Sequence, residues 1–220
     1  MEIIQRIESP NFDRKAIGIQ FLIIHYTAST LQRATDLFSD PTSGVSCHLL
    51  IDETGNVYEI VKCWEGLAYK ARHCGESHWN DGNRTWSDFN NISLGLELVN
   101  ANGNIVEYTA EQYRALKQVI GHLKEKYPEL NSPHRVLGHE HIAGWRGKAD
   151  PGLMFDWAAF FESCYPGREI PKRQSICPIE LQIALRKFLA VIPKDEKEAT
   201  NFWHALSYIT ETCVSLLNRK

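Results

Sequence analysis

The sequence predicts an α/β protein in which helices flank a central mixed β-sheet, and three observations carry this prediction. Residues 19–24 form a run of strand length that is apolar except at Gln20, which is typical of a strand buried on both faces. Two further segments of strand length, 47–51 and 57–61, flank residues 52–56, a Gly-containing connection of the kind that joins the strands of a hairpin. A helical pattern then occupies residues 109–127. Strands interspersed with helices indicate a sheet that helices cover.

The other elements of the first half follow from the same local signals. Residues 31–39 are expected to form a short helix, residues 47–51 and 57–61 the two hairpin strands, and residues 92–99 another strand. Residues 64–91 are rich in Gly, His, Trp and Asn and show no clear periodicity. Such a composition is typical of a loop that lines a substrate site.

The best-defined helix begins after Thr109. The segment from Thr109 to Gln112 has the spacing of a capping box, and apolar residues then recur at helical intervals until Pro128 ends the pattern. Residues 136–138 are expected to form a short strand and residues 155–165 a closing helix.

Beyond Pro166 the pattern changes to two apolar stripes at helical spacing. The stripes are Leu181, Leu185, Phe188 and Ile192, and then Phe202, Leu206, Ile209, Cys213 and Leu216. We therefore expect two domains of unequal size: a main domain at 1–165 and a C-terminal helical extension of two amphipathic helices at 166–220. The extension is expected to pack against the core or to form a homodimer contact.

The amino-acid composition indicates the class of protein, its location and the partners it is not expected to have. The chain has 43% hydrophobic and 23% charged residues and a net charge of −3, as an ordinary globular protein does. No secretory signal and no apolar run of roughly 18 residues is present, so we expect a cytoplasmic location without a membrane span. Nucleic acid is not an expected partner, because proteins that bind phosphate backbones usually carry a concentrated basic face, whereas residues 1–165 of this chain are net negative. The six cysteines lack C-x-x-C spacing and are expected to be reduced and mostly buried.

The most informative segment is 138–157, GHEHIAGWRGKADPGLMFDW. It places a histidine, a lysine and an aspartate around a turn. His139 and Asp150 lie eleven residues apart, and the glycines and the proline between and after them rule out a continuous helix. A loop must therefore bring the two side chains together, as in a metal site.

This segment resembles the C-terminal motif of the zinc-dependent N-acetylmuramoyl-L-alanine amidases, the amidase-2 family, which includes the AmpD-like enzymes and is related to a phage lysozyme and to the peptidoglycan recognition proteins. Three more segments match that family in the same order: QFLIIHYTAST at 20–30, VSCHLLID at 45–52 and ISLGLELV at 92–99. The resemblance covers residues 19–157. It implies the family's mixed sheet flanked by helices and makes residues 1–165 an amidase catalytic domain. Related cell-envelope amidases often carry a small helical peptidoglycan-binding domain at the C-terminal end, so a degenerate version of that domain is an alternative for residues 166–220.

The resemblance also implies the site residues. It assigns one zinc ion to His25, His139 and Asp150, which leaves an open position for water or substrate. It makes Glu97 the general base that moves a proton from the attacking water to the leaving amine, and places the Lys148 ammonium beside the oxyanion of the tetrahedral intermediate. Taken singly, each residue has a plainer interpretation: a hydrogen-bonded histidine at a strand end, a carboxylate on the surface of an edge strand, or a solvated loop lysine.

Four further residues are expected to contact substrate, namely His48, His73, Trp79 and Asn80. His48 matches the family's V-S-x-H position, and His73 lies in ARHCG, which resembles the family's A-W-H-A-G. Either histidine could instead orient the metal ligands, and Trp79 and Asn80 could hold their loop to the core. The AmpD-type enzymes have an arginine where this chain has Gly44, so the stem-peptide preference stays open.

The expected function is hydrolysis of the amide bond between N-acetylmuramic acid, including its 1,6-anhydro form, and L-alanine in muropeptides during bacterial peptidoglycan recycling. One alternative is a lysin that degrades intact cell wall. Residues 1–165 carry the net negative charge, which disfavours long residence on an anionic wall. The other alternative, a non-catalytic peptidoglycan-recognition module, has no need for a complete set of metal ligands and catalytic residues.

Overall fold

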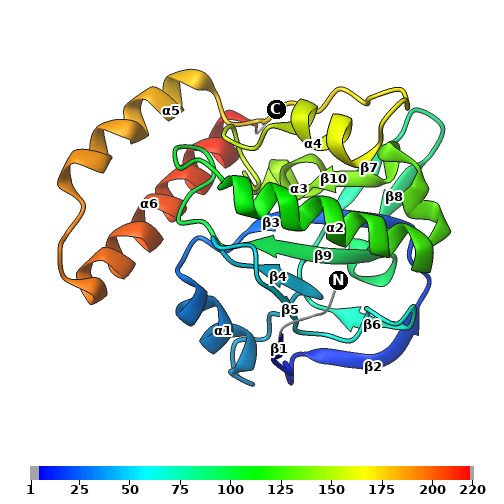
Figure 1. Ribbon diagram of the computed structural model, residues 1–220. Coiled ribbons are helices and arrows are strands. Elements are labelled where there is room, and N and C mark those ends of the chain that lie inside the picture. Colours follow the sequence, from blue (N-terminus) through cyan, green and yellow to red (C-terminus); the bar gives the residue numbers. More distant parts are fainter. Residues whose placement is uncertain (1–4, 219–220) are drawn as a thin grey trace.

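Six strands form the central sheet of the structure, a computed structural model that describes residues 5–218 (Figure 1). In spatial order they are β1 (Gln5–Arg6), β5 (Val57–Glu59), β4 (Leu49–Ile51), β9 (Ser93–Leu98), β3 (Phe21–Tyr26) and β10 (Val136–Gly138). Neighbouring strands are parallel except in the β4–β5 hairpin, which is antiparallel. The predicted mixed sheet is therefore confirmed.

The remaining elements surround this sheet. The helices are α1 (Leu31–Ser39), α2 (Ala110–Lys126), α3 (His139–Ala143), α4 (Trp157–Cys164), α5 (Ile179–Arg186) and α6 (Glu196–Leu217). The 3-10 turns are η1 (Phe89–Asn91), η2 (Pro128–Asn131), η3 (Pro133–Arg135), η4 (Gly144–Arg146) and η5 (Lys187–Val191). Two small antiparallel sheets pair β2 (Phe12–Ile17) with β6 (Ala68–Ala71) and β7 (His78–Asn80) with β8 (Thr85–Ser87).

The side chains of the central strands alternate between two buried faces. Leu22 and Ile24 of β3 belong, with Leu96 of β9, to the core cluster that α2 and α4 cover (Figure 1). Phe21 and Ile23 belong to a second cluster, on the other face. Residues 25 and 97 continue the second set, so strand alternation directs both side chains away from the face that α2 and α4 cover, at the carboxyl ends of β3 and β9.

Strand β3 ends later than the sequence predicted, and this affects the site. The apolar run predicted a strand that ends before His25, whereas β3 continues through His25 to Tyr26. His25 lies opposite Glu97 in the parallel β3–β9 ladder. The interpretation of Glu97 as a residue of an edge strand is wrong, because β9 has a strand on each side.

The segment at 64–91 contains regular structure that the sequence did not predict. It forms β6, β7, β8 and η1, each of three or four residues. β2 was not predicted either. β6, β7 and β8 span too few residues for an alternating pattern to show, and β2 pairs with β6, which lies far from it in the chain.

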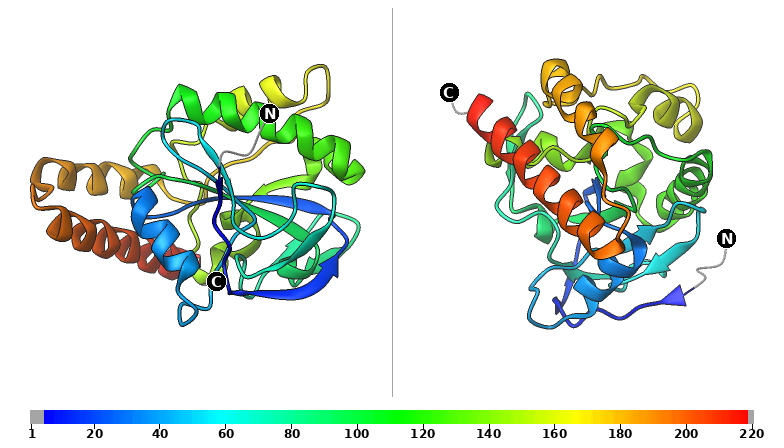
Figure 2. Two further views of the ribbon diagram at one scale, coloured as in Figure 1. Left: turned by 60° about the horizontal axis from the view of Figure 1, so that its bottom comes forward. Right: turned by 90° about the vertical axis from the view of Figure 1, so that its left-hand side faces the viewer.

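The C-terminal extension forms α5 and α6, where two amphipathic helices were expected, although the first ends at Arg186 and continues as η5. Figure 2 shows the two helices side by side, projecting from the sheet. Within residues 5–218, no helix is long and apolar enough to cross a bilayer. The six cysteines are unpaired, and all except Cys213 are buried.

Candidate active site

Three potential metal ligands meet at the carboxyl end of β3. His25 Nδ1 lies 2.9 Å from Asp150 Oδ2 and 3.2 Å from His139 Nδ1. His139 Nδ1 lies 3.1 Å from the same Asp150 oxygen. All three residues are buried. The structure thus brings together the three side chains that the resemblance assigned to zinc.

Each of these side chains comes from a different kind of element. His25 belongs to β3, and His139 is the first residue of α3, directly after β10. The loop that carries Asp150 is tied to α3, because the Glu140 amide donates to the Asp150 carbonyl at 2.9 Å. Gly138 permits this approach, since a Cβ there would lie 2.6 Å from Pro151 Cδ. The predicted loop therefore closes by backbone contacts.

The hydrogen bonds of His139 determine which of its nitrogens is free. Its Nε2 lies 3.0 Å from the Cys74 carbonyl oxygen, which can only accept, so Nε2 carries a hydrogen and Nδ1, on the side of Asp150, is the nitrogen available to a metal. Burial lowers the pKa of His25 to about 4, so this ring is neutral at pH 7. Burial opposes ionisation of Asp150, but the neighbouring His139 and His25 hold its pKa well below the ordinary value.

These donor atoms fit a tetrahedral zinc ion. Ligand bonds of about 2.0–2.1 Å at tetrahedral angles separate donor atoms by roughly 3.3 Å, close to the separations of 2.9–3.2 Å found here. The bond from His139 to the Cys74 carbonyl is the kind of second contact that orients a metal-binding imidazole. Two imidazoles and one carboxylate are a suitable ligand set for zinc.

A second set of close donor atoms shares His25. The ligand atoms of His25, His73 and Cys74 also lie within 4.8 Å of one another. Burial raises the pKa of the Cys74 thiol well above its ordinary value, so the thiolate that a metal would need is disfavoured. The set that contains Asp150 is the better metal site.

Glu97 and Lys148 border the same site. Both line a hollow of about 210 Å³ together with His25, His139 and Asp150. The Oε2 atom of Glu97 is buried and has no hydrogen-bond partner among residues 5–218. Burial, and then the negative charge of Asp150, raise the pKa of Glu97 well above its ordinary value. A carboxyl group in this state is suited to accepting a proton.

The hollow at the ligands opens into a larger one of about 510 Å³. Residues common to both linings are Val45, Arg72, His73, His139 and Lys148. Gly44 lines the larger hollow and has no atom within 4 Å of the position a Cβ would take. The two hollows form one cleft that leads from solvent to the ligands.

Comparison with known proteins identifies the family. The model of the N-acetylmuramoyl-L-alanine amidase family, amidase-2, matches residues 14–153, which is more than half of the chain. The chain belongs to the amidase-2 family. The matched segment contains the three ligands, Glu97 and Lys148, and it ends before α5 and α6.

Individual relatives agree with this assignment. A selenomethionine derivative of AmpD superposes with a TM-score of 0.60 at 26% identity, covering 74% of this chain and 95% of that one. The amidase AmiD from E. coli, solved with anhydro-N-acetylmuramic acid-L-Ala-D-γ-Glu-L-Lys, has a TM-score of 0.57 at 23% identity over 81% of this chain and 73% of its own. A Rickettsia conorii protein named as an N-acetylmuramoyl-L-alanine amidase is 28% identical over 123 residues, 54% of this chain. The match spans only 43% of that relative's length.

The two histidines expected to contact substrate take different positions in this amidase-2 fold. His48 is fully buried, and both of its ring nitrogens bond to backbone groups, so it has no surface to offer a substrate. His73 is half-buried in the cleft, with Nδ1 3.1 Å from His25 Nε2. Gly95 makes room for the His73 ring, since a Cβ at Gly95 would lie 2.5 Å from it.

Trp79 and Asn80, also expected to contact substrate, do not line the cleft. The Trp79 ring meets Phe21 edge-on at 5.9 Å and lies beneath the Arg173 guanidinium. The Asn80 side chain bonds to Thr85 and to the Gly82 amide, within the β7–β8 hairpin. These two residues hold the hairpin together and to the core, which was the structural alternative for them.

Glu211 is a charged residue of the cleft that the sequence did not predict. It comes from α6, outside the family match, and lines the hollow beside Lys148. In the sequence, Glu211 is only a single carboxylate on an amphipathic helix, and such a residue does not show which side chain it will contact.

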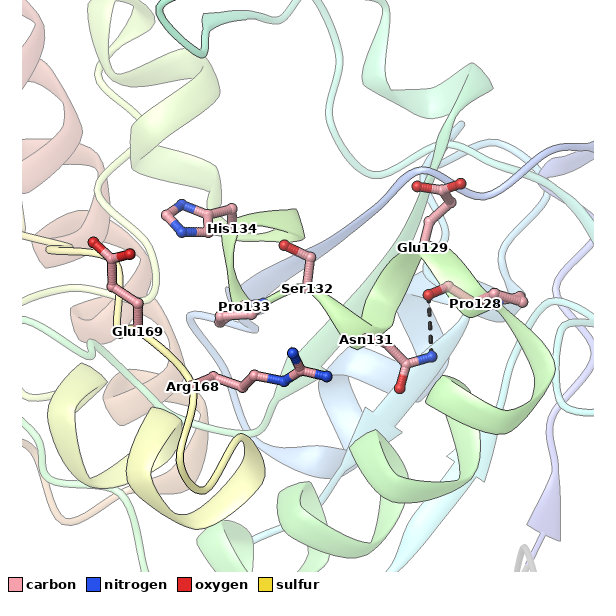
Figure 3. Close-up of a pocket in the computed structure, with 8 residues that line it drawn as sticks. All are labelled: Pro128, Glu129, Asn131, Ser132, Pro133, His134, Arg168 and Glu169. Atoms are coloured by element: carbon pink, nitrogen blue, oxygen red, sulfur yellow. Dashed lines mark hydrogen bonds between the residues drawn. The ribbon is translucent and has the colours of Figure 1, made fainter.

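A separate hollow of about 500 Å³ lies beside η2 and η3 (Figure 3). Among the described residues, it contains no set of converging metal ligands.

Proposed function

We propose that this chain is a zinc amidase that hydrolyses the bond between the lactyl group of N-acetylmuramic acid and L-alanine in muropeptides. The observation that carries the proposal is the convergence of His25, His139 and Asp150 in the cleft that Glu97 and Lys148 also line. The family description and the similarity to AmpD at 26% identity support the same reaction. A non-catalytic recognition module would need neither the three metal ligands nor the buried carboxyl group of Glu97, whose Oε2 has no hydrogen-bond partner among the described residues.

The residues have distinct tasks in this reaction. A zinc ion held by the ligand set would polarise the scissile carbonyl and lower the pKa of water. Glu97, buried and without a hydrogen-bond partner at Oε2, accepts a proton from the attacking water and passes it to the leaving amine. Lys148 supplies positive charge where the carbonyl oxygen becomes an anion. His73 contacts His25 and helps to orient it.

We further propose soluble muropeptides, including the 1,6-anhydro form, as the substrate in peptidoglycan recycling. The net negative charge of residues 1–165 opposes adsorption to an anionic wall. One observation favours the alternative of a wall-degrading lysin: no atom lies within 4 Å of a Cβ position at Gly44, so the cleft is open on that side, where a polymeric glycan could enter. A homodimer through α5 and α6 stays a prediction.

Metal analysis and turnover of paired variants test the chemistry. Wild type should carry about one zinc per chain. Asp150→Ala should lose most of it, because two neutral imidazoles alone hold a divalent cation poorly. Glu97→Gln should keep the zinc and lose about 10²- to 10⁴-fold in kcat, since an amide cannot accept the proton.

The matched control is Glu125→Gln, an exposed carboxylate on α2, which should behave as wild type. Full zinc occupancy in Asp150→Ala would remove this residue from the ligand set. Near-normal kcat in Glu97→Gln would contradict its role. Parallel digestion of muropeptides and intact sacculi, read by mass spectrometry, separates the two substrates: faster release from sacculi would favour the lysin.

A further inference from the structure

The C-terminal helix α6 contributes one side chain to the lining of the cleft. Leu206, Thr210 and Val214 are buried where α6 packs against the main domain, and Thr210 accepts a hydrogen bond from the Asn102 side chain at 3.2 Å. Glu211, the next residue along α6, lines the hollow that contains the metal ligands. Figure 2 shows α6 packed against the main domain along part of its length. A helix outside the family match thus contributes a carboxylate to the site.

Glu211 holds the Lys148 ammonium with both oxygens. The distances from Lys148 Nζ are 2.9 Å to Oε1 and 3.1 Å to Oε2. Within residues 5–218, no other group forms a hydrogen bond or ion pair with this ammonium. An ammonium has three N–H donors, and a carboxylate held this way engages at most two of them. At least one donor remains for a ligand in the cleft.

The main chains of the Lys148 loop and of α6 are also in close contact. Gly147, the residue before Lys148, has φ +94 and packs so closely on α6 that a Cβ would lie 2.2 Å from the Glu211 carbonyl oxygen. The loop of Lys148 and the turn of α6 that carries Glu211 therefore meet through main chain as well as side chain. Lysine has a flexible stem, so an anchor at each end of it restricts where the ammonium can lie.

This ion pair is poorly explained as a stabilising device. The two side chains are 30% and 33% exposed, and ion pairs with such access to solvent contribute only about 0–1 kcal/mol to stability. Their place in the cleft, beside Glu97 and the metal ligands, indicates a function there instead.

We propose that Glu211 is a positioning residue of the amidase site: it holds the Lys148 ammonium so that a free N–H points at the developing oxyanion. The inference rests on the proposed amidase function and adds α6 to the catalytic unit. It predicts that Glu211 acts through Lys148 and has no effect without it.

A double-mutant cycle on the zinc-loaded, full-length chain tests this. Glu211→Ala should lower kcat on an anhydromuramoyl tripeptide by about tenfold, within the range of coupling between contacting residues, with KM, zinc content and Tm close to wild type. Glu211→Gln, which keeps one oxygen acceptor and the shape, should lie between. In a Lys148→Ala background, Glu211→Ala should cause no further loss of kcat. Glu198→Gln, an exposed carboxylate on the first turn of α6, is the control and should match wild type.

The outcomes separate the two proposals. Unchanged kcat in both Glu211 variants, or an equal loss with and without Lys148, would overturn the positioning role while leaving the amidase intact. An inactive, zinc-loaded wild type would refute the amidase function and the role of Glu211 with it. If Glu211→Ala does not fold, the isosteric Glu211→Gln variant replaces it in the double-mutant cycle with Lys148→Ala.

Discussion

A single buried ring, that of His48, joins two strands next to the cleft. Its Nδ1 accepts the Gly95 amide hydrogen at 2.9 Å, and its Nε2 donates to the Tyr69 carbonyl at 2.9 Å. These bonds require the neutral ring with the hydrogen on Nε2. Burial lowers the pKa of His48 to about 4. A residue expected to contact substrate is thus part of the scaffold that places Gly95, two residues from Glu97.

The lowered pKa of His48 predicts a loss of stability in acid. The native ring stays neutral down to about pH 4, whereas the unfolded ring takes up a proton below about pH 6.5. Between these values the unfolded state binds more protons, so the free energy of unfolding falls as the pH falls. From pH 7.5 to pH 5, His48 alone should remove about 2 kcal/mol. Urea unfolding at the two pH values measures this change.

The matched variants for that measurement are His48→Gln and His204→Gln. The first lacks the titrating ring and should lose less stability between the two pH values than wild type. The second removes an exposed histidine of α6 and should show the wild-type difference. Equal pH dependence in all three proteins would show that His48 does not control this transition.

At the scale of elements, the N-terminus of α2 shows how a local motif also makes tertiary contacts. The Thr109 hydroxyl accepts the Gln112 amide hydrogen, and the Gln112 side chain accepts that of Thr109, each at 3.1 Å. The same hydroxyl donates to the Glu53 carbonyl at 2.7 Å, in the β4–β5 turn. Gln112 also donates to the Val99 carbonyl at 2.9 Å, just beyond β9. The predicted capping box therefore ties α2 to the sheet.

Loss of this cap should destabilise the fold without affecting catalysis. Thr109→Ala removes the cap acceptor and the bond to Glu53, so the free energy of unfolding should fall by about 1–2 kcal/mol. Thr109→Ser keeps the hydroxyl and should lose much less. Urea unfolding compares the two variants, and kcat should be unchanged in both because Thr109 lies outside the cleft. Equal stability of the Ala and Ser variants would contradict the capping role.

At the scale of the whole molecule, the C-terminal extension shares a core with the amidase fold. Leu185 and Leu206 pack with Ile105, and Val214 packs with Ala149, the residue before Asp150. Burying each such aliphatic side chain contributes about 1.5–3 kcal/mol, so together they approach the roughly 5–15 kcal/mol that holds a domain folded. We therefore expect residues 166–218 to belong to the same folded unit as the main domain.

Truncation before residue 166 should consequently impair the protein as a whole. The shortened chain would expose Ile105 and Ala149 and lack Glu211, so we expect a lower Tm and little or no turnover of soluble muropeptide. Leu217→Ser, at a 58% exposed position near the end of α6, should stay within about 0.5 kcal/mol of wild type. A truncated chain with normal Tm and normal kcat on muropeptide would show that the extension is a separate appendage.

The sequence by itself determined the features that depend on neighbours in the chain. The apolar run at 19–24 predicted β3, the spacing of Thr109 and Gln112 predicted the start of α2, and the glycines of 138–157 predicted the loop that brings Asp150 to His139. Each is a local property, since strand burial, helix capping and turn formation act over a few residues.

The tertiary structure decided the features that depend on residues far apart in the chain. Trp79 could line the cleft or hold its hairpin until the packing on Phe21 placed it, and His48 could face substrate until its bonds to Gly95 and Tyr69 were visible. Glu211 lies 63 residues beyond Lys148, and no periodicity relates them. Long-range contacts form wherever the packed surfaces of two elements meet, and the local pattern of neither element specifies its partner.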